Sequence, residues 1–397
     1  MYRRDSKSHH QALKVPERTT VFKVKSPNSS LRMKLGIIAS TIVVTSLTLS
    51  AGLWPFSFYV RNGASWSADH HGLYFSGFGT ATGSSPYDRS TTCANHSDFS
   101  LELWVQPDKA TRWGTILAFG SKDEQGSFAV RQSLDDIQIV HSLGPGDYKT
   151  NSRSLYVDNA FATTATTFLT VSVSDAETSV FLNGHRIPRT RDLGIKCGDL
   201  AGTLVLGTAI SSNDTWTGTV LGLAAYNRSL GAEGVEKHFR AWTQDSHRNL
   251  KSSLDALALY VFDERTGDTV HDLESEGKRI AVPDNYSIVN KRFLQPFWEE
   301  FSWDRAYASD IALNIIGFIP LGICLAALLD AVVGARHPLA TTTLLCLATS
   351  LSIEVLQAFI PIRYSGTTDL ITNTCGGALG ANLYWVFVKR ILIRQPL

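Results

Sequence analysis

The stretch IALNIIGFIPLGICLAALLDAVVG, Ile311–Gly334, contains a single charged residue and is long enough to cross a membrane as one helix. An α-helix rises about 1.5 Å per residue, so about 20 apolar residues cross a hydrocarbon core of roughly 30 Å. Two further apolar runs follow, Pro338–Pro361 and Leu370–Val388, and an uncharged run, Leu35–Trp54, lies near the N-terminus. The sequence therefore predicts an integral membrane protein with four transmembrane helices.

The run nearest the N-terminus, Leu35–Trp54, is compatible with either a retained anchor or a cleaved signal peptide. Its apolar core is long for a signal peptide, and the basic tail before it, residues 1–34, is long as well. These two features favour a retained anchor.

Basic residues lie on one side of the predicted spans. Residues 1–34 are rich in lysine and arginine, Arg336 lies in the turn after the second span, and Lys389 follows the last one. Cytoplasmic loops carry an excess of such residues, and four spans return the chain to its starting side. We therefore expect both termini in the cytoplasm and the region 60–290 on the outer side of the membrane.

The overall composition excludes two broad classes of protein. The chain has 37 Lys plus Arg against 36 Asp plus Glu in 397 residues, so its formal net charge is only +1. A general nucleic-acid binder needs a basic surface, so no nucleic-acid partner is expected. Hydrophobic residues make up 44% of the chain, which is too many for an intrinsically disordered protein.

The region 60–290 has the pattern of an antiparallel β-sandwich. Short runs of alternating apolar and polar residues are separated by Gly, Asn, Asp and Ser, as in FSLELWVQP (Phe99–Pro107) and FLTVSVS (Phe168–Ser174). In TSVFLNG (Thr178–Gly184), the Asn-Gly pair is a strong signal for a tight hairpin. The fold class is therefore a membrane α-helical part joined to an all-β part.

Several of these strands resemble a laminin-G-like, concanavalin A-like jelly roll. The matching segments are GLYFSGFG (Gly72–Gly79), FSLELWVQPD (Phe99–Asp108) and the closing strand and helix in Trp216–Phe239. Residues Ala256–Asp284 resemble the strand that often begins such domains, and here they predict a permuted or extra strand.

This resemblance implies a lectin-like or a glycan-hydrolysing domain. Retaining hydrolysis needs two carboxylates about 5 Å apart, and Glu102 has no carboxylate two residues later on its strand. Binding of a glycan or a protein is therefore the favoured interpretation. Trp104 and Trp113 could stack on sugar rings, although buried tryptophans are common in sandwiches. No cofactor is predicted; the resemblance implies that calcium is possible, but at no assignable residue, and the metal content stays unknown.

Two of the five cysteines, Cys93 and Cys197, lie in the predicted outer domain. An oxidising compartment favours a disulfide between them. Two free thiols are the alternative, since the sequence does not show whether the residues are close together.

The C-terminal spans carry polar residues at helical spacing, each near the predicted outer end of its span. Residues three or four apart share a helix face, and an acidic group within a membrane is costly unless it faces the bundle or a wet cavity. We call the following residues the polar cluster: Asp310, Asn314, Glu354, Gln357, Arg363, Asp369 and Asn373. Two interpretations stay open, a ligand-binding pocket and a network that packs the helices together.

The same spans resemble the VanZ-like membrane family, which includes a protein linked to resistance against the glycopeptide antibiotic teicoplanin. The matching segments are DIALNIIGFIPLG (Asp310–Gly322), SIEVLQAFIPIR (Ser352–Arg363) and TDLITNTCGGALGA (Thr368–Ala381). The resemblance implies a VanZ-like domain over residues 306–390 and a bacterial cell-envelope setting. It implies no particular reaction.

We therefore expect the polar cluster to form an outward-facing pocket for an amphiphilic envelope ligand. A membrane lipid, a lipid-linked precursor or a lipophilic glycopeptide antibiotic would fit such a pocket, and the outer domain would bind glycan or protein. One alternative is an intramembrane enzyme in which Glu354 accepts a proton. Another is an adhesin-like module that uses the spans only as an anchor. The sequence does not predict an oligomeric state.

Overall fold

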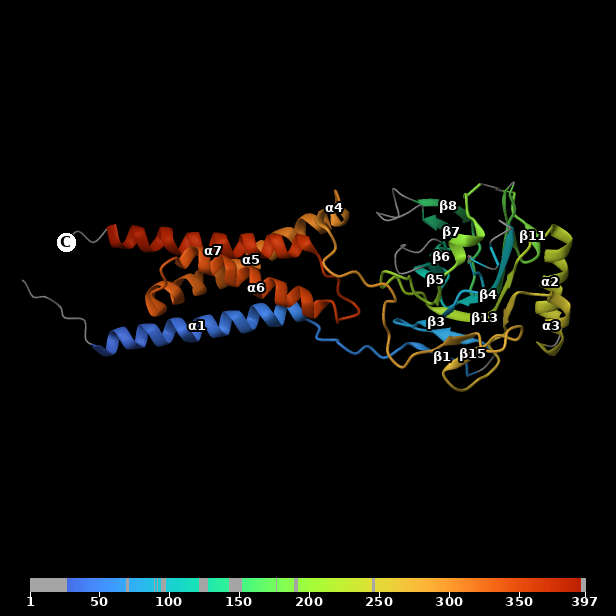
Figure 1. Ribbon diagram of the computed structural model, residues 1–397, viewed down its shortest axis with the longest axis horizontal. Coiled ribbons are helices and arrows are strands. Elements are labelled where there is room, and N and C mark those ends of the chain that lie inside the picture. The colour runs from blue at the N-terminus through green and yellow to red at the C-terminus, as the bar shows by residue number, and fades with distance from the viewer. Residues whose placement is uncertain are drawn as a thin grey trace, which may run out of the picture.

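The structure is a computed structural model, and it describes residues 27–68, 71–88, 90, 92–93, 98–120, 128–142, 152–175, 177–188, 192–244 and 247–393. A bundle of long helices and a β-sandwich lie end to end (Figure 1). The basic tail up to residue 26 lies outside the described residues.

The β-sandwich consists of two antiparallel sheets. In spatial order, the first contains β1 (Ala64–Trp66), β2 (Leu73–Phe75), β13 (Gly218–Tyr226), β4 (Phe99–Pro107), β9 (Thr167–Val173), β10 (Thr178–Leu182) and β11 (His185–Arg186), with β14 (Ala258–Tyr260) beside β13. The second contains β15 (Thr269–His271), β16 (Arg279–Ala281), β3 (Ala81–Ser84), β12 (Thr203–Leu206), β5 (Arg112–Gly120), β6 (Phe128–Leu134), β7 (Asp136–Ser142) and β8 (Ser152–Val157). The predicted antiparallel sandwich is therefore confirmed.

Alternation along β4 divides its side chains between two layers. Leu101 and Leu103 point into the core between the two sheets. Ser100, Glu102 and Trp104 face the opposite way, toward helices α2 (Ala232–Gln244) and α3 (His247–Leu254), which cover the outer face of this sheet (Figure 1). The sandwich thus has a helical layer on the side far from the bundle.

The segment after the sandwich returns to it, as the resemblance predicted. β14 pairs with β13, and β16 pairs with both β15 and β3, so residues 258–281 add short strands to both sheets. The Asn183-Gly184 hairpin is also confirmed, since Leu182 and His185 pair across it and both central residues have positive φ.

Among the residues that the structure describes, the bundle contains four long helices. They are α1 (Pro27–Leu53), α5 (Arg305–Leu328) with a following π-helical turn (Leu329–Val333), α6 (Pro338–Gln357) and α7 (Thr367–Ile393). Within the described residues, three helices are long and apolar enough to span a membrane, over Leu31–Leu53, Arg305–Val333 and Pro338–Gln357. The fourth predicted span lies within helix α7, which is not among these three.

Helix ends differ from the predicted ones where local capping operates. α5 begins at Arg305, six residues before the apolar run, because the side chain of Asp304 accepts a hydrogen bond from the N–H of Tyr307. α6 ends at Gln357, and the predicted residues 358–361 form a turn.

Glycines allow α5 and α7 to pack with their backbones in contact. A Cβ added to Gly376 would lie 2.3 Å from the carbonyl oxygen of Ile315, and one on Gly380 would lie 2.2 Å from that of Ile319. No side chain fits at such distances, so only glycine permits this approach. The close packing brings the polar residues of α5 and α7 within hydrogen-bonding reach.

Candidate functional site

Two members of the polar cluster and one further carboxylate meet at the N-terminal end of α7. Glu354, buried on α6, accepts a hydrogen bond of 2.9 Å from the N–H of Gly366. Glu300, the last residue of α4 (Phe297–Glu300), accepts one of 3.0 Å from the N–H of Thr368. Asp369 lies in the first turn of α7. A helix N-terminus has unpaired N–H groups and partial positive charge, so it stabilises these carboxylates.

The same carboxylates also influence one another. Glu354 experiences the charges of Asp369 and Glu300, and Asp369 experiences those of Glu300, Asp310 and Arg363. Arg363 therefore offsets part of a local excess of negative charge. Sequence reasoning missed Glu300, because the contact with Thr368 depends on the path of the chain before α5.

Gln357 and Arg363 converge on the end of α1. Gln357 Nε2 donates a hydrogen bond of 2.7 Å to the carbonyl oxygen of Gly52, and Arg363 Nη2 lies 3.4 Å from the same oxygen. Gln357 is 4% exposed, yet its Oε1 atom is buried without a hydrogen-bond partner. A buried amide oxygen without a donor costs free energy, so this atom is suited to accept a hydrogen bond from a ligand or a water molecule.

The remaining members of the polar cluster form contacts between helices or face outward. Asn314 Nδ2 donates to Asp369 Oδ1 at 2.7 Å, and Asn373 Nδ2 donates to Ser350 Oγ at 3.0 Å. Asp310 is exposed. The structure thus brings most of the cluster to the sandwich end of the bundle, while Asn373 contacts α6 separately, one turn further along α7.

Lys291 closes the end of α6 and was not anticipated from the sequence. Its Nζ donates to the carbonyl oxygen of Gln357 at 2.9 Å and also to that of Ile360. Burial lowers the pKa of Lys291 to about 8. A cation at a helix C-terminus is favourable for the unpaired carbonyl groups there.

A pocket of about 500 Å³ lies where the sandwich meets the membrane part. We call it the junction pocket, and its residues come from both parts of the chain. The sandwich supplies Thr115, Ala118, Ala129, Arg131, Val140, Ser142, Ala209, Ile210, Ser211, Ser212 and Asp214. The segment before α5 and the loop before α7 supply Arg292, Gln295, Glu299, Tyr364 and Ser365.

The loop before α7 connects the junction pocket to the polar cluster. Tyr364 and Ser365 line the pocket, and the next residue, Gly366, donates to Glu354. Tyr364 also contacts the sandwich, because its hydroxyl donates to Asn213 Oδ1 and accepts a hydrogen bond of 3.2 Å from the N–H of Asn213. A ligand in the pocket would therefore touch the loop that Glu354 holds.

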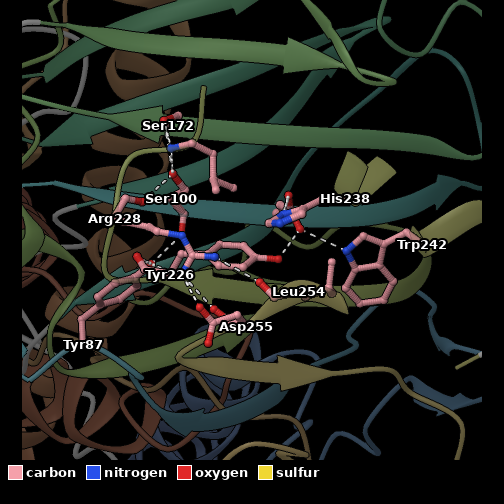
Figure 2. Close-up of polar contacts among 11 residues, drawn as sticks. Tyr87, Ser100, Ser172, Tyr226, Arg228, His238, Trp242, Leu254 and Asp255 are labelled. Atoms are coloured by element: carbon pink, nitrogen blue, oxygen red, sulfur yellow. Dashed lines mark hydrogen bonds and ion pairs between the residues drawn. The ribbon is translucent and has the colours of Figure 1, made fainter. Parts of the chain in front are cut away.

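A separate group of polar residues, between the first sheet and α2, surrounds Glu102. This carboxylate is fully buried and accepts hydrogen bonds from Tyr226 Oη at 2.5 Å and Trp242 Nε1 at 3.1 Å, while His238 Nδ1 lies 2.9 Å away. Figure 2 shows Tyr226, His238 and Trp242 pointing toward one another. Burial and the neighbouring Glu102 raise the pKa of Tyr226 well above its ordinary value, so this hydroxyl stays a donor. The arrangement fixes α2 on the sheet.

The structure also places the tryptophans and cysteines that were considered from the sequence. Trp104 packs against Trp242 with ring centroids 6.2 Å apart, whereas Trp113 is 55% exposed. Cys93 and Cys197 are joined by a disulfide. In the part of the chain that the structure describes, no group of three or more His, Cys, Asp or Glu residues is placed to hold a metal ion.

Two family models match the chain. The VanZ/LLP1 family matches residues 256–388, and the concanavalin A-like lectin/glucanases superfamily matches residues 78–236. The first match begins within the sandwich, because it includes β14, β15 and β16.

Solved structures also align with part of the chain. A crystal structure titled HCR/D-Sa-GBL1/C has a TM-score of 0.38 and 9% identity, with 46% of each chain covered. The binding domain of botulinum neurotoxin DC, in complex with rat synaptotagmin II, has a TM-score of 0.34 and 10% identity, again with 46% of each chain covered. A Trypanosoma rangeli sialidase has a TM-score of 0.36 and 15% identity, with 47% of this chain and 29% of that chain covered.

The alignments span less than half of each of these structures, and their scores carry no argument about a ligand. Family and fold rest instead on the two family models, the apolar helices and the paired sheets. The chain is an integral membrane protein with a VanZ-like domain at its C-terminus and a concanavalin A-like, laminin-G-like domain at residues 78–236.

Proposed function

We propose that the VanZ-like domain binds the polar head of an amphiphilic envelope ligand at the end of the helical bundle next to the sandwich, on the outer side of the membrane. We also propose that the sandwich recognises a glycan or a protein. The observation that carries this proposal is the unpaired Oε1 atom of Gln357, buried one turn from Glu354 and sharing a hydrogen-bond acceptor with Arg363. An acceptor, a carboxylate and a guanidinium together suit a head group that has both donors and acceptors.

The proposed orientation has both termini in the cytoplasm and the sandwich outside. The start of α1 and the end of α7 lie at the end of the bundle away from the sandwich (Figure 1). The turn with Arg336, which lies between the π-helical turn and α6, belongs to that same end. This arrangement agrees with the excess of basic residues expected in cytoplasmic segments. The proposed host membrane is a bacterial cytoplasmic membrane, by similarity to the VanZ family, and the proposed ligands include lipid-linked precursors and lipophilic glycopeptides.

Native mass spectrometry of the detergent-extracted protein tests the proposal. The wild-type chain should retain a lipid or another amphiphile. Gln357→Leu keeps roughly the side-chain volume but removes the Oε1 acceptor together with the Nε2 donor to Gly52, so it should retain clearly less. Asn382→Leu is the matched control, because Asn382 is an exposed amide past the middle of α7, away from the polar cluster. Equal retention by Gln357→Leu and wild type would contradict the proposal.

In the second candidate function, the helices serve only to anchor the sandwich as a binding module. The hydrogen bonds among the polar residues of the helices favour it. Glu354, Asn314, Gln357 and Asn373 each have a hydrogen-bond partner within the chain, as in a helix-packing network. Under this alternative, no amphiphile is retained and replacement of the polar cluster leaves the phenotype unchanged. If the domain were instead an intramembrane enzyme, the Glu354→Gln variant would keep its affinity for the ligand but lose turnover.

A further inference from the structure

The junction pocket has an apolar floor and a polar rim. The floor is the outer face of the second sheet, where Ala129 on β6 and Val140 on β7 alternate with the core residues Val130 and Ile139. Residues with hydroxyl side chains also line the pocket, namely Thr115, Ser142, Ser211, Ser212, Tyr364 and Ser365. The volume of about 500 Å³ lies within the range of roughly 300–1,000 Å³ typical of small-molecule sites.

The charges in the pocket form two ion pairs, one from each part of the chain. Arg131 Nη2 lies 2.9 Å from Asp214 Oδ2 on the sandwich side, and Thr115 Oγ1 donates to the same carboxylate at 2.6 Å. Arg292 pairs with Glu299 on the membrane side. The side chains of both pairs are 16–28% exposed, so they are partly accessible from the pocket.

The balance of these charges limits the class of ligand. Two guanidinium groups and two carboxylates give the pocket no net charge, so an anionic ligand attracted by the arginines would be repelled by Asp214 and Glu299. A ligand with many hydroxyl groups suits the pocket better, because each hydroxyl both donates and accepts a hydrogen bond. The apolar floor fits the C–H face of a sugar ring or an acetamido methyl group.

We propose that the junction pocket binds a neutral saccharide through both ion pairs, and that tight binding needs the sandwich and the membrane part together. This inference rests on the proposed function, which it deepens by naming the chemical class of the ligand's outermost portion. A saccharide bound there contacts Tyr364 and Ser365 in the loop before α7. The next residue of this loop, Gly366, donates a hydrogen bond to Glu354, so the saccharide lies next to the polar cluster.

A glycan array read with the full-length chain in lipid nanodiscs tests the inference. The array carries neutral hexose and N-acetylhexosamine oligosaccharides beside sialylated and phosphorylated versions of the same sugars. We expect binding to neutral members and weaker binding to their acidic versions. The affinity for the best neutral oligosaccharide, free in solution and without a lipid, is then measured by calorimetry.

Two carboxamide variants locate the site. Asp214→Asn on the sandwich and Glu299→Gln on the membrane side each remove a charge that accepts hydrogen bonds, and each should weaken binding roughly tenfold or more. Glu177→Gln is the matched control, because Glu177 pairs with Arg186 on the sandwich, outside the pocket, and should bind like wild type.

Several results would overturn the inference. They are the absence of binding to every neutral saccharide, a preference for the acidic versions, and unchanged affinity in both variants. Loss of affinity in Asp214→Asn alone would also overturn it, because the site would then belong to the sandwich only. The soluble saccharide carries no lipid, so this experiment fails or succeeds independently of the lipid-retention experiment.

Discussion

Glu102 shows how one buried carboxylate can fix the position of a whole helix. Replacing it by leucine leaves the donors of Tyr226, His238 and Trp242 buried without their acceptor. Removing one partner of a buried charged network costs about 3–5 kcal/mol. We therefore expect Glu102→Leu to lower the free energy of unfolding by about 3 kcal/mol or more, and Glu102→Gln, which keeps one carbonyl oxygen, to lower it less.

Denaturant unfolding followed by tryptophan fluorescence measures this effect, because Trp242 reports on the contact between α2 and the sheet. Glu177→Gln serves as the exposed control and should change the unfolding free energy by less than about 0.5 kcal/mol. If Glu102→Leu unfolded like that control, the carboxylate would not be what holds α2 in place.

His141 makes the stability of the sandwich depend on pH. Its Nε2 lies 3.1 Å from Asp199 Oδ2, and its Nδ1 lies 2.8 Å from the carbonyl oxygen of Leu193. Burial lowers the pKa of His141, but the hydrogen bonds to Asp199 and Leu193 and the charge of Asp199 outweigh it, so the pKa is raised above its ordinary value. The imidazolium is therefore favoured in the folded state.

A histidine with a raised folded-state pKa stabilises the protein fully below its unfolded-state pKa and loses this contribution as pH rises through the folded-state value. We expect His141→Gln to destabilise the sandwich more at pH 5.5 than at pH 8.5. Urea unfolding of both proteins at the two pH values checks this. An equal difference at both pH values, or a larger one at pH 8.5, would contradict it.

At the residue scale, helical spacing predicted which polar residues share a helix face but not which groups they bind. Gln357 and Arg363 meet at the carbonyl oxygen of Gly52, and Glu354 binds the N–H of Gly366. These partners are backbone groups, which every residue type provides, so no sequence pattern points to them. Glu300 was missed for a related reason, since its role depends on the chain path before α5.

At the scale of elements, the glycines of α7 set the distance between α5 and α7. A Cβ at Gly376 would collide with the backbone of Ile315, so the two helices must separate to accommodate it. Gly376→Ala should lower the unfolding free energy of the bundle by about 1–3 kcal/mol, as overpacking does. A lower melting temperature in nanodiscs, measured by circular dichroism at the helical band, is the expected observation.

Gly317 on α5 provides the matched control for that experiment. No atom lies within 4 Å of the Cβ that would be added there, and the residue is exposed. Gly317→Ala should leave the melting temperature unchanged or raise it slightly, because alanine favours the helix more than glycine does. If both variants melted at the same temperature, close backbone packing would not determine the stability of the bundle.

The strands were easier to predict than their order in the sheets. Phe99–Pro107 has the predicted bounds because alternation of apolar and polar residues is a local property. The order β13-β4-β9, and the way β16 joins β3, depend on contacts between residues far apart in the chain. Alternation within one strand carries no information about its neighbours, so the sheet topology had to come from the structure.

At the scale of the whole molecule, the orientation in the membrane governs which ligands can reach the junction pocket. The sandwich lies beyond the end of the bundle where α7 begins (Figure 1), which is also the end where Glu354 binds the loop before α7. An envelope ligand therefore reaches both only if the sandwich is outside. Glu236, on α2, is exposed on the far side of the sandwich, and Arg336 is exposed in the turn at the opposite end of the bundle. These two positions form a matched pair for a labelling experiment.

In intact cells, a membrane-impermeant maleimide should label Glu236→Cys at once, and it should label Arg336→Cys only after the membrane is opened. Cys324, Cys346 and Cys375 lie in the helices, so labelling of the wild-type chain gives the background. The reverse pattern would place the sandwich in the cytoplasm, and both the envelope ligand and the disulfide between Cys93 and Cys197 would then lack the outer, oxidising compartment that they require. The expected pattern would leave the junction pocket facing the space where envelope glycans occur, which is the condition for saccharide binding to have a physiological role.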